Sequence, residues 1–175
     1  MKRIRTLIWF LTTTVLIFSF ADIGLAFQNE PDGFRGLKWG DPPTEDMVCV
    51  DILEGELRLY KCLNDKLHIG DAWFHKIVYS FFGWPGRLMG VSLHFYGERN
   101  YKLLENICQG RFGKEITKQF YKHFWMGQQA NVLLTYDVAK DEGALALTNS
   151  MILSEYTKAV EAEKKRRAEE TQEDW

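Results

Sequence analysis

Residues 76–96 read KIVYSFFGWPGRLMGVSLHFY, and this stretch decides the fold class. Two runs rich in aromatic and β-branched residues, 76–82 and 88–96, flank the turn residues 83–86, a pattern typical of a β-hairpin. Successive side chains of a strand point to opposite faces of a sheet. We therefore expect one set of apolar side chains in the second run to face the core, namely Met89, Val91, Leu93 and Phe95.

Further strands and three helices are expected on either side of this hairpin. Residues 48–53 and 57–62 predict a second hairpin around the turn Gly55-Glu56. A short helix can begin near Thr44, and a longer one can begin near Asn100 and end at Gly110 or Gly113. The remaining expected elements are strands at 120–126, 131–138 and 144–152 and a charged helix from Ser154 onward.

These elements together predict an α+β protein. We expect an antiparallel sheet of roughly six to eight strands, built from hairpins and packed against a central helix. The expected organisation is a single globular domain over residues 27–153 followed by a charged C-terminal helix over residues 154–175. A weak twofold repeat of a helix-plus-sheet unit is compatible with this order, although no residue-level similarity between the halves supports it.

The first 26 residues have the layout of a secretory signal peptide. Three basic residues within the first five positions precede the uncharged run 7–20, which is followed by Asp22 and small residues. The run is short for a membrane span. We expect cleavage after Ala26, with Ala21 as the alternative site, and a periplasmic or secreted protein that does not span the membrane. An uncleaved membrane anchor is the competing interpretation.

The charge balance argues against nucleic-acid binding. The formal net charge is −2, whereas nucleic-acid binders carry a clear positive excess. Four consecutive basic residues, 164–167, lie in the expected final helix, but acidic residues surround them. We interpret this segment as a solvated helix face and expect no nucleic-acid partner.

Three cysteines in an exported chain favour one disulfide and one leftover thiol. If Gly55-Glu56 is a two-residue turn, Cys49 lies directly opposite Cys62 as a non-hydrogen-bonded pair, which is close enough for a bridge. A different turn length would break this match. The spacing therefore predicts a Cys49–Cys62 disulfide, conditional on the turn, and leaves Cys108 as a small buried hydrophobe.

No strong catalytic or cofactor motif is present. The sequence lacks C-x-x-C, H-E-x-x-H, a Walker A loop, an EF-hand loop and a complete G-x-S-x-G. Ser92 belongs to a fragment of the last motif, but it lies within a strand rather than at a strand-to-helix turn. We predict no catalytic, cofactor-binding or metal-binding residues and no cofactor, and we consider an enzyme the weaker alternative.

A metal-dependent hydrolase would have to be assembled by the fold. No two histidines share a metal-ligand spacing, and the acidic residues lie around turns, where such residues are common anyway. His94 and His123 with nearby carboxylates are the best candidates for such a site. The full set of scattered groups is His68, His75, His94 and His123, with Glu54, Glu56, Asp65 and Asp71 as the acids.

Trp84 and Pro85 are the candidate partner contacts, because a hairpin tip normally projects into solvent. An exposed indole there lowers solubility unless it docks on the domain or contacts a partner. We favour docking, because Trp beside Pro in a turn often folds back, and we keep partner contact as the alternative.

The segment GFRGLKWG at 33–40, followed by Asp46-Met47, resembles the opening of a family of uncharacterised exported bacterial proteins. The resemblance implies export but carries over no activity or site residues. More distantly, the plan is similar to small helix-plus-sheet modules of periplasmic envelope-assembly lipoproteins and of the β-lactamase inhibitor protein, which bind proteins. The family resemblance continues through 64–67, 69–70, 76–79, 112–114 and 125–127.

The resulting expectation is an exported, non-catalytic binding domain that contacts another envelope protein. The contact would use an exposed sheet face or the hairpin tip, with the final helix as a second contact. A small-ligand carrier with a pocket between sheet and helix is one alternative, and the metal-dependent hydrolase is another. The sequence does not define the oligomeric state.

Overall fold

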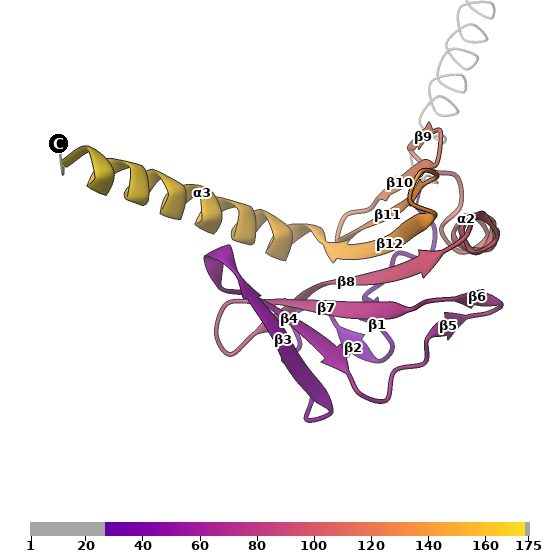
Figure 1. Ribbon diagram of the computed structural model, residues 1–175, viewed down its shortest axis with the longest axis horizontal. Coiled ribbons are helices and arrows are strands. Elements are labelled where there is room, and N and C mark those ends of the chain that lie inside the picture. The colour runs from indigo at the N-terminus through magenta and orange to yellow at the C-terminus, as the bar shows by residue number, and fades with distance from the viewer. Residues whose placement is uncertain (1–26, 174–175) are drawn as a thin grey trace, which may run out of the picture.

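The computed structural model describes residues 27–173, so the expected signal peptide lies outside the described residues. Figure 1 shows a twisted sheet with one helix against it and a second helix projecting away from it. The elements in chain order are β1 (Gly33–Phe34), β2 (Leu37–Lys38), β3 (Met47–Leu53), the 3-10 turn η1 (Glu54–Glu56), β4 (Leu57–Cys62), β5 (His68–Ile69), β6 (Ala72–Trp73), β7 (Lys76–Phe82), β8 (Arg87–Tyr96), α2 (Glu98–Phe112), β9 (Thr117–Gln119), β10 (Lys122–Met126), β11 (Ala130–Asp137), β12 (Glu142–Asn149) and α3 (Ser150–Glu173).

The main sheet confirms the α+β prediction. It has eight strands in the order β3-β4-β7-β8-β12-β11-β10-β9, and each neighbouring pair is antiparallel. The first four strands form one meander and the last four form another, joined along β8 and β12. The helix α2 connects the two meanders, and β1-β2 and β5-β6 form two small separate hairpins.

A bulge in β8 changes the expected core face. Ser80 pairs with Gly90, but Phe81 pairs with Leu88, so Met89 has no partner on β7. A bulge of this kind reverses the alternation of side chains beyond it. Val91, Leu93 and Phe95 lie in the main core as predicted, and Leu88 joins them. Met89 is also buried, but in a smaller cluster with Leu57 and Ile152, so its predicted face is wrong.

The β3-β4 hairpin is confirmed, but its predicted register is wrong. Leu53 pairs with Leu57, so the turn has the three residues Glu54–Glu56 instead of two. Gly55 adopts a φ of +71°, a backbone conformation that side chains with a Cβ disfavour. A second irregularity, between Cys49 and Asp51, shifts the register once more.

The core lies between the sheet and α2. The helix buries one stripe of side chains against the strands, and this stripe has the helical spacing that lets neighbouring turns contribute to one face. Asn100 is not its cap, because the helix begins at Glu98. The Asn100 side chain instead accepts a hydrogen bond from the Trp73 backbone N–H and donates one to the Tyr96 carbonyl. The buried residues of α2 are Tyr101, Leu104, Cys108 and Phe112.

Two segments cap the carboxyl end of α2, namely Gly113 after the helix and residues 28–29 near the beginning of the described chain. Gly113, one of the two predicted helix ends, has a φ of +78° and donates its N–H to the Gln109 carbonyl. The Gln28 N–H donates to the Phe112 carbonyl at 2.9 Å, and the Asn29 side chain donates to the Arg111 carbonyl at 2.9 Å. The beginning of the described chain therefore satisfies carbonyl groups that the helix itself leaves open.

Helix α3 begins earlier than the charge pattern predicts. The Asn149 side chain accepts a hydrogen bond from the Ile152 N–H at 2.9 Å, which is the geometry of an N-cap, so the helix starts at Ser150 rather than Ser154. Its first turns pack on the sheet through Ile152 and on the β3-β4 turn through Tyr156. Figure 1 shows the remainder projecting away from the sheet, as the sequence predicts for its charged part.

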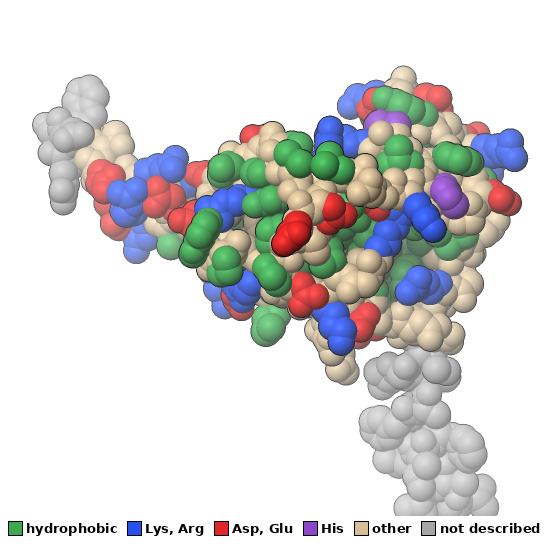
Figure 2. Space-filling model, turned by 90° about the horizontal axis from the view of Figure 1, so that it is seen from below, with side chains coloured by type: hydrophobic (Ala, Val, Ile, Leu, Met, Phe, Trp, Pro, Cys, Tyr) green, Lys and Arg blue, Asp and Glu red, His purple; other side chains and the backbone are tan. Residues whose placement is uncertain are grey.

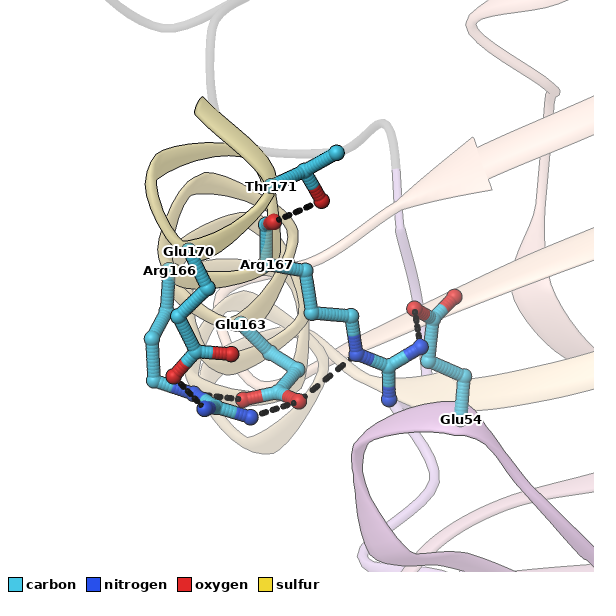
Figure 3. A network of polar contacts seen from close by, with 6 residues as sticks. All are labelled: Glu54, Glu163, Arg166, Arg167, Glu170 and Thr171. Atoms are coloured by element: carbon cyan, nitrogen blue, oxygen red, sulfur yellow. Dashed lines mark hydrogen bonds and ion pairs between the residues drawn. The ribbon is translucent and has the colours of Figure 1, made fainter. Parts of the chain in front are cut away.

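A network of ion pairs lines the projecting part of α3 (Figure 3). Glu163 accepts hydrogen bonds from Arg166 and Arg167, and Arg166 also pairs with Glu170. Arg167 reaches Glu54 of the β3-β4 turn at 3.6 Å. Lys165, Arg166 and Arg167 thus have acidic partners on an exposed helix face. Exposed pairs of this kind contribute little to stability.

Two further local predictions are wrong. No helix forms near Thr44; the segment is a turn in which the Thr44 carbonyl accepts the Met47 N–H. The expected strand 120–126 begins only at Lys122, because Phe120 and Tyr121 form the turn between β9 and β10 and Tyr121 has a φ of +56°.

Candidate functional site

The tip of the β7-β8 hairpin carries the most prominent exposed aromatic group at this end of the sheet. Trp84 is 83% exposed, and the Arg58 guanidinium lies 5.1 Å from the centre of its ring. Arg58 also donates a hydrogen bond to the Gly83 carbonyl at 3.3 Å. Trp84 therefore does not fold back into the domain, contrary to the favoured expectation, and its ring lies against the half-buried Arg58 side chain.

Ile52 extends this exposed group onto the edge strand. It pairs with Arg58 in the β3-β4 register, so the two side chains share a face of the hairpin, and Ile52 is 63% exposed. Pro85 beside Trp84 is exposed as well. We call Ile52, Arg58, Trp84 and Pro85 the Trp84 patch.

The strand β3 itself has an unusually apolar surface for a sheet edge. It is the first strand in the sheet order and pairs on one side only, with β4. Edge strands usually carry charges that discourage pairing with other chains. Among the residues of β3 only Asp51 is charged, and Val48, Val50 and Leu53 are exposed in addition to Ile52. Figure 2, viewed from below Figure 1, shows hydrophobic side chains gathered near the base of α3.

The cysteines do not form the predicted pair. The observed register places Cys49 opposite Tyr60 and Cys62 opposite Met47, and all three cysteines are free thiols in this structure. The cause is the three-residue turn together with the irregularity in β3. Cys62 lies 3.0 Å from an Asp46 carboxylate oxygen, and burial together with this contact raises the pKa of its thiol. Cys108 is buried on the inner face of α2, as predicted.

The two candidate catalytic histidines lie on opposite faces of the sheet. His123 faces α2, because its Nε2 is 3.3 Å from a carboxylate oxygen of Glu105 on that helix. His94 precedes the core residue Phe95 in β8 and therefore points the other way. Within residues 27–171 no group of three His, Cys, Asp or Glu side chains is arranged to hold a metal ion. His94 and His123 therefore do not contribute to one shared site.

Ser92 and His94 do meet, on the open face of the sheet. Ser92 Oγ lies 2.8 Å from His94 Nε2. Burial, with Lys76 and His75 adding to it, lowers the pKa of His94, so the imidazole is neutral at pH 7. Both residues are nevertheless within β8, whose backbone pairs with β7 and β12 on either side. Backbone N–H groups of β8 that are occupied in this way cannot serve as oxyanion donors beside Ser92.

A buried polar cluster beneath α2 joins His123, a candidate named from the sequence, to two carboxylates that were not singled out from the sequence. His123 is 2% exposed and lies 3.3 Å from Glu105 through Nε2 and 3.3 Å from Glu115 through Nδ1. Burial acts to raise the pKa of Glu115, but its own backbone N–H and the neighbouring His123 and Lys118 outweigh burial and hold that pKa below its ordinary value. The cluster ties α2 to β10. A signal was available, because His123 lies two residues before the core residue Trp125 and therefore shares its inward face of the strand.

The four acidic turn residues form no catalytic pair. Asp65 forms an ion pair with Arg35 and accepts a hydrogen bond from the Tyr79 hydroxyl at 2.7 Å. Glu54 is engaged with Arg167 of α3. Glu56 and Asp71 are exposed at their turns. These carboxylates are dispersed and act in structural contacts or face solvent.

Comparisons with known proteins do not assign the chain to a group. It matches no protein-family model, no curated protein and no solved structure. The family resemblance of residues 33–40 and the similarity of plan to envelope modules therefore stay predictions. Among residues 27–173, no helix has both the length and the apolar character needed to cross a membrane.

Proposed function

We propose that this protein is an exported, non-catalytic binding domain that contacts another protein of the cell envelope. The observation that carries the proposal is the Trp84 patch, in which an exposed indole, a guanidinium and an aliphatic side chain lie together at one end of the sheet. Trp and Arg dominate the binding energy of protein interfaces. Solvent exposure of such a group is unfavourable for an isolated domain, and a partner would remove it.

The proposed location rests on the N-terminal sequence. A basic start, an uncharged run and small residues before Phe27 are typical of a cleaved signal peptide. Phe27 stacks on Phe112 with ring centres 5.3 Å apart, so cleavage after Ala26 would remove no residue of the described fold. The new amino group would lie near the carboxyl end of α2, where the helix dipole favours positive charge.

Site-specific photo-crosslinking in intact cells tests the binding proposal. A photoreactive amino acid replaces Trp84 in one variant and Val138 in the control, which is exposed in the turn between β11 and β12 at the other end of β8. We expect a discrete protein adduct from position 84, absent from position 138, that weakens when Ile52→Asp is added. Equal background crosslinking at both positions would refute the Trp84 patch as a contact surface.

A further inference from the structure

A cavity of about 300 Å³ lies between α2 and the sheet, on a different part of the molecule from the Trp84 patch. Its wall comes from Leu104, Ile107 and Phe112 of α2, from Leu145 and Leu147 of β12, and from Phe34 of the β1-β2 hairpin. Ligand sites typically have volumes of roughly 300 Å³ or more and are mostly apolar with a few polar groups. The cavity therefore has the size and lining of a site for a small ligand.

The interior of the cavity offers no charge to a ligand. Cys108 contributes to its wall and is 1% exposed, and burial raises the pKa of its thiol to about 12, so the thiol stays protonated at neutral pH. An apolar tail would be well accommodated there, because it replaces poorly bound water. At roughly 30 Å³ for each water-sized group, the volume corresponds to about ten non-hydrogen atoms.

Two arginines, Arg35 and Arg111, lie at the edge of this cavity, and they differ in whether the guanidinium group already has an acidic partner. Arg35 is paired with Asp65 and donates to the His68 carbonyl. Arg111 is exposed and has no acidic partner within 4.0 Å among residues 27–171. Three carbonyl groups of the last α2 turn, those of Gln109, Arg111 and Phe112, are hydrogen bonded to Gly113, Asn29 and Gln28, which weakens their repulsion of an anion.

From this combination we infer that the cavity binds a small amphipathic monocarboxylate, with its apolar tail between α2 and β12 and its carboxylate at Arg111. Guanidinium groups bind carboxylates through two parallel hydrogen bonds, which gives the edge of the site its specificity. An eight-carbon fatty acid has the required number of atoms. This inference goes beyond the proposed protein contact and does not depend on it, since the two sites share no residue.

Isothermal titration calorimetry of the protein as its host processes it, with octanoate as the probe, tests this inference. Butyrate has the carboxylate without the tail, and octylamine has the tail with the opposite charge. We expect octanoate to bind measurably and both other probes to bind at least about tenfold more weakly. No octanoate binding, or octylamine binding as tightly as octanoate, would overturn the inference without affecting the Trp84 proposal.

Variants then locate the site. Arg111→Gln should weaken octanoate binding about fivefold, the scale of a partly exposed charge pair, and leave octanol binding unchanged. Arg99→Gln is the matched control, since Arg99 is an exposed arginine near the other end of the same helix. Ile107→Phe should weaken the binding of both octanoate and octanol, because the larger side chain fills the cavity. Wild-type affinity in both Arg111→Gln and Ile107→Phe would place octanoate elsewhere and refute the assignment.

Discussion

Replacing Gly55 by alanine should weaken the packing of α3 against the β3-β4 turn. A Cβ atom at position 55 would lie 2.6 Å from Val160 Cγ2 and 3.1 Å from Tyr156 Cε2. Both distances are shorter than ordinary van der Waals contact, so the turn, the helix or these two side chains must shift. Position 55 also has a φ of +71°, which an alanine adopts only at a cost.

The two contributions can be separated. The left-handed backbone costs alanine about 1 kcal/mol, and overpacking costs about 1–3 kcal/mol more. Gly83→Ala is the matched control, because Gly83 has a φ of +74° and a Cβ atom added there would meet nothing within 4 Å. Gly55→Ala should therefore destabilise the protein by about 2–4 kcal/mol and Gly83→Ala by about 1 kcal/mol.

Urea unfolding measures the free energy of unfolding of Gly55→Ala and of its control Gly83→Ala. Adding Val160→Ala and the double variant Gly55→Ala/Val160→Ala completes a double-mutant cycle for the contact between positions 55 and 160. Val160→Ala removes the methyl group in closest approach, so the double variant should be more stable than the sum of the single effects predicts. A favourable coupling of about 1 kcal/mol or more is expected. Equal destabilisation by Gly55→Ala and Gly83→Ala, with no coupling between Gly55→Ala and Val160→Ala, would refute the described packing of α3 against the turn.

Three further outcomes are expected. The lowered pKa of Glu115 means that its carboxylate stabilises the fold above its ordinary value of 4.5, and this contribution is lost as the pH falls through the lower folded-state pKa. Glu115→Gln should therefore reduce the urea midpoint at pH 6, with the difference from wild type shrinking toward pH 3. In thiol titration without reductant, exposed Cys49 should react first and Cys108 only after unfolding; a native protein with no reactive Cys49 would instead indicate a bridge. Deleting residues 162–175 should change the free energy of unfolding by less than about 0.5 kcal/mol, because residues 162–173 of α3 project from the sheet (Figure 1) and their one ion pair with the rest of the described residues, Arg167–Glu54, is exposed; a larger loss would contradict this description.

The sequence predicted those features of the fold that depend on local chemistry. The turn residues 83–86 and the runs beside them define the β7-β8 hairpin, and Gly113 ends α2 as expected. Periodicity cannot reveal a bulge, because the extra residue has the same apolar character as its neighbours. Met89 was therefore assigned to the wrong face.

The candidate site was predicted less completely, for a related reason. Trp84 was recognised because a tip aromatic is conspicuous in one short segment. Its neighbours Ile52 and Arg58 come from another hairpin, and their positions depend on a register fixed by a three-residue turn that resembles a two-residue one in the sequence. The disulfide prediction was wrong for the same cause, since a register shift of this size separates Cys49 from Cys62.

The pairing of β8 with β12, which connects the two meanders, has a consequence for how this chain folds. Within each meander, the strands that pair are close in the sequence, whereas this joint pairs Gly90 with Thr148 and Tyr96 with Glu142. Local pairings close small loops and form early, and distant pairings form late because more chain must be ordered first. The two meanders should therefore acquire protection from hydrogen exchange before they merge, and the step that unites them should limit the rate of folding.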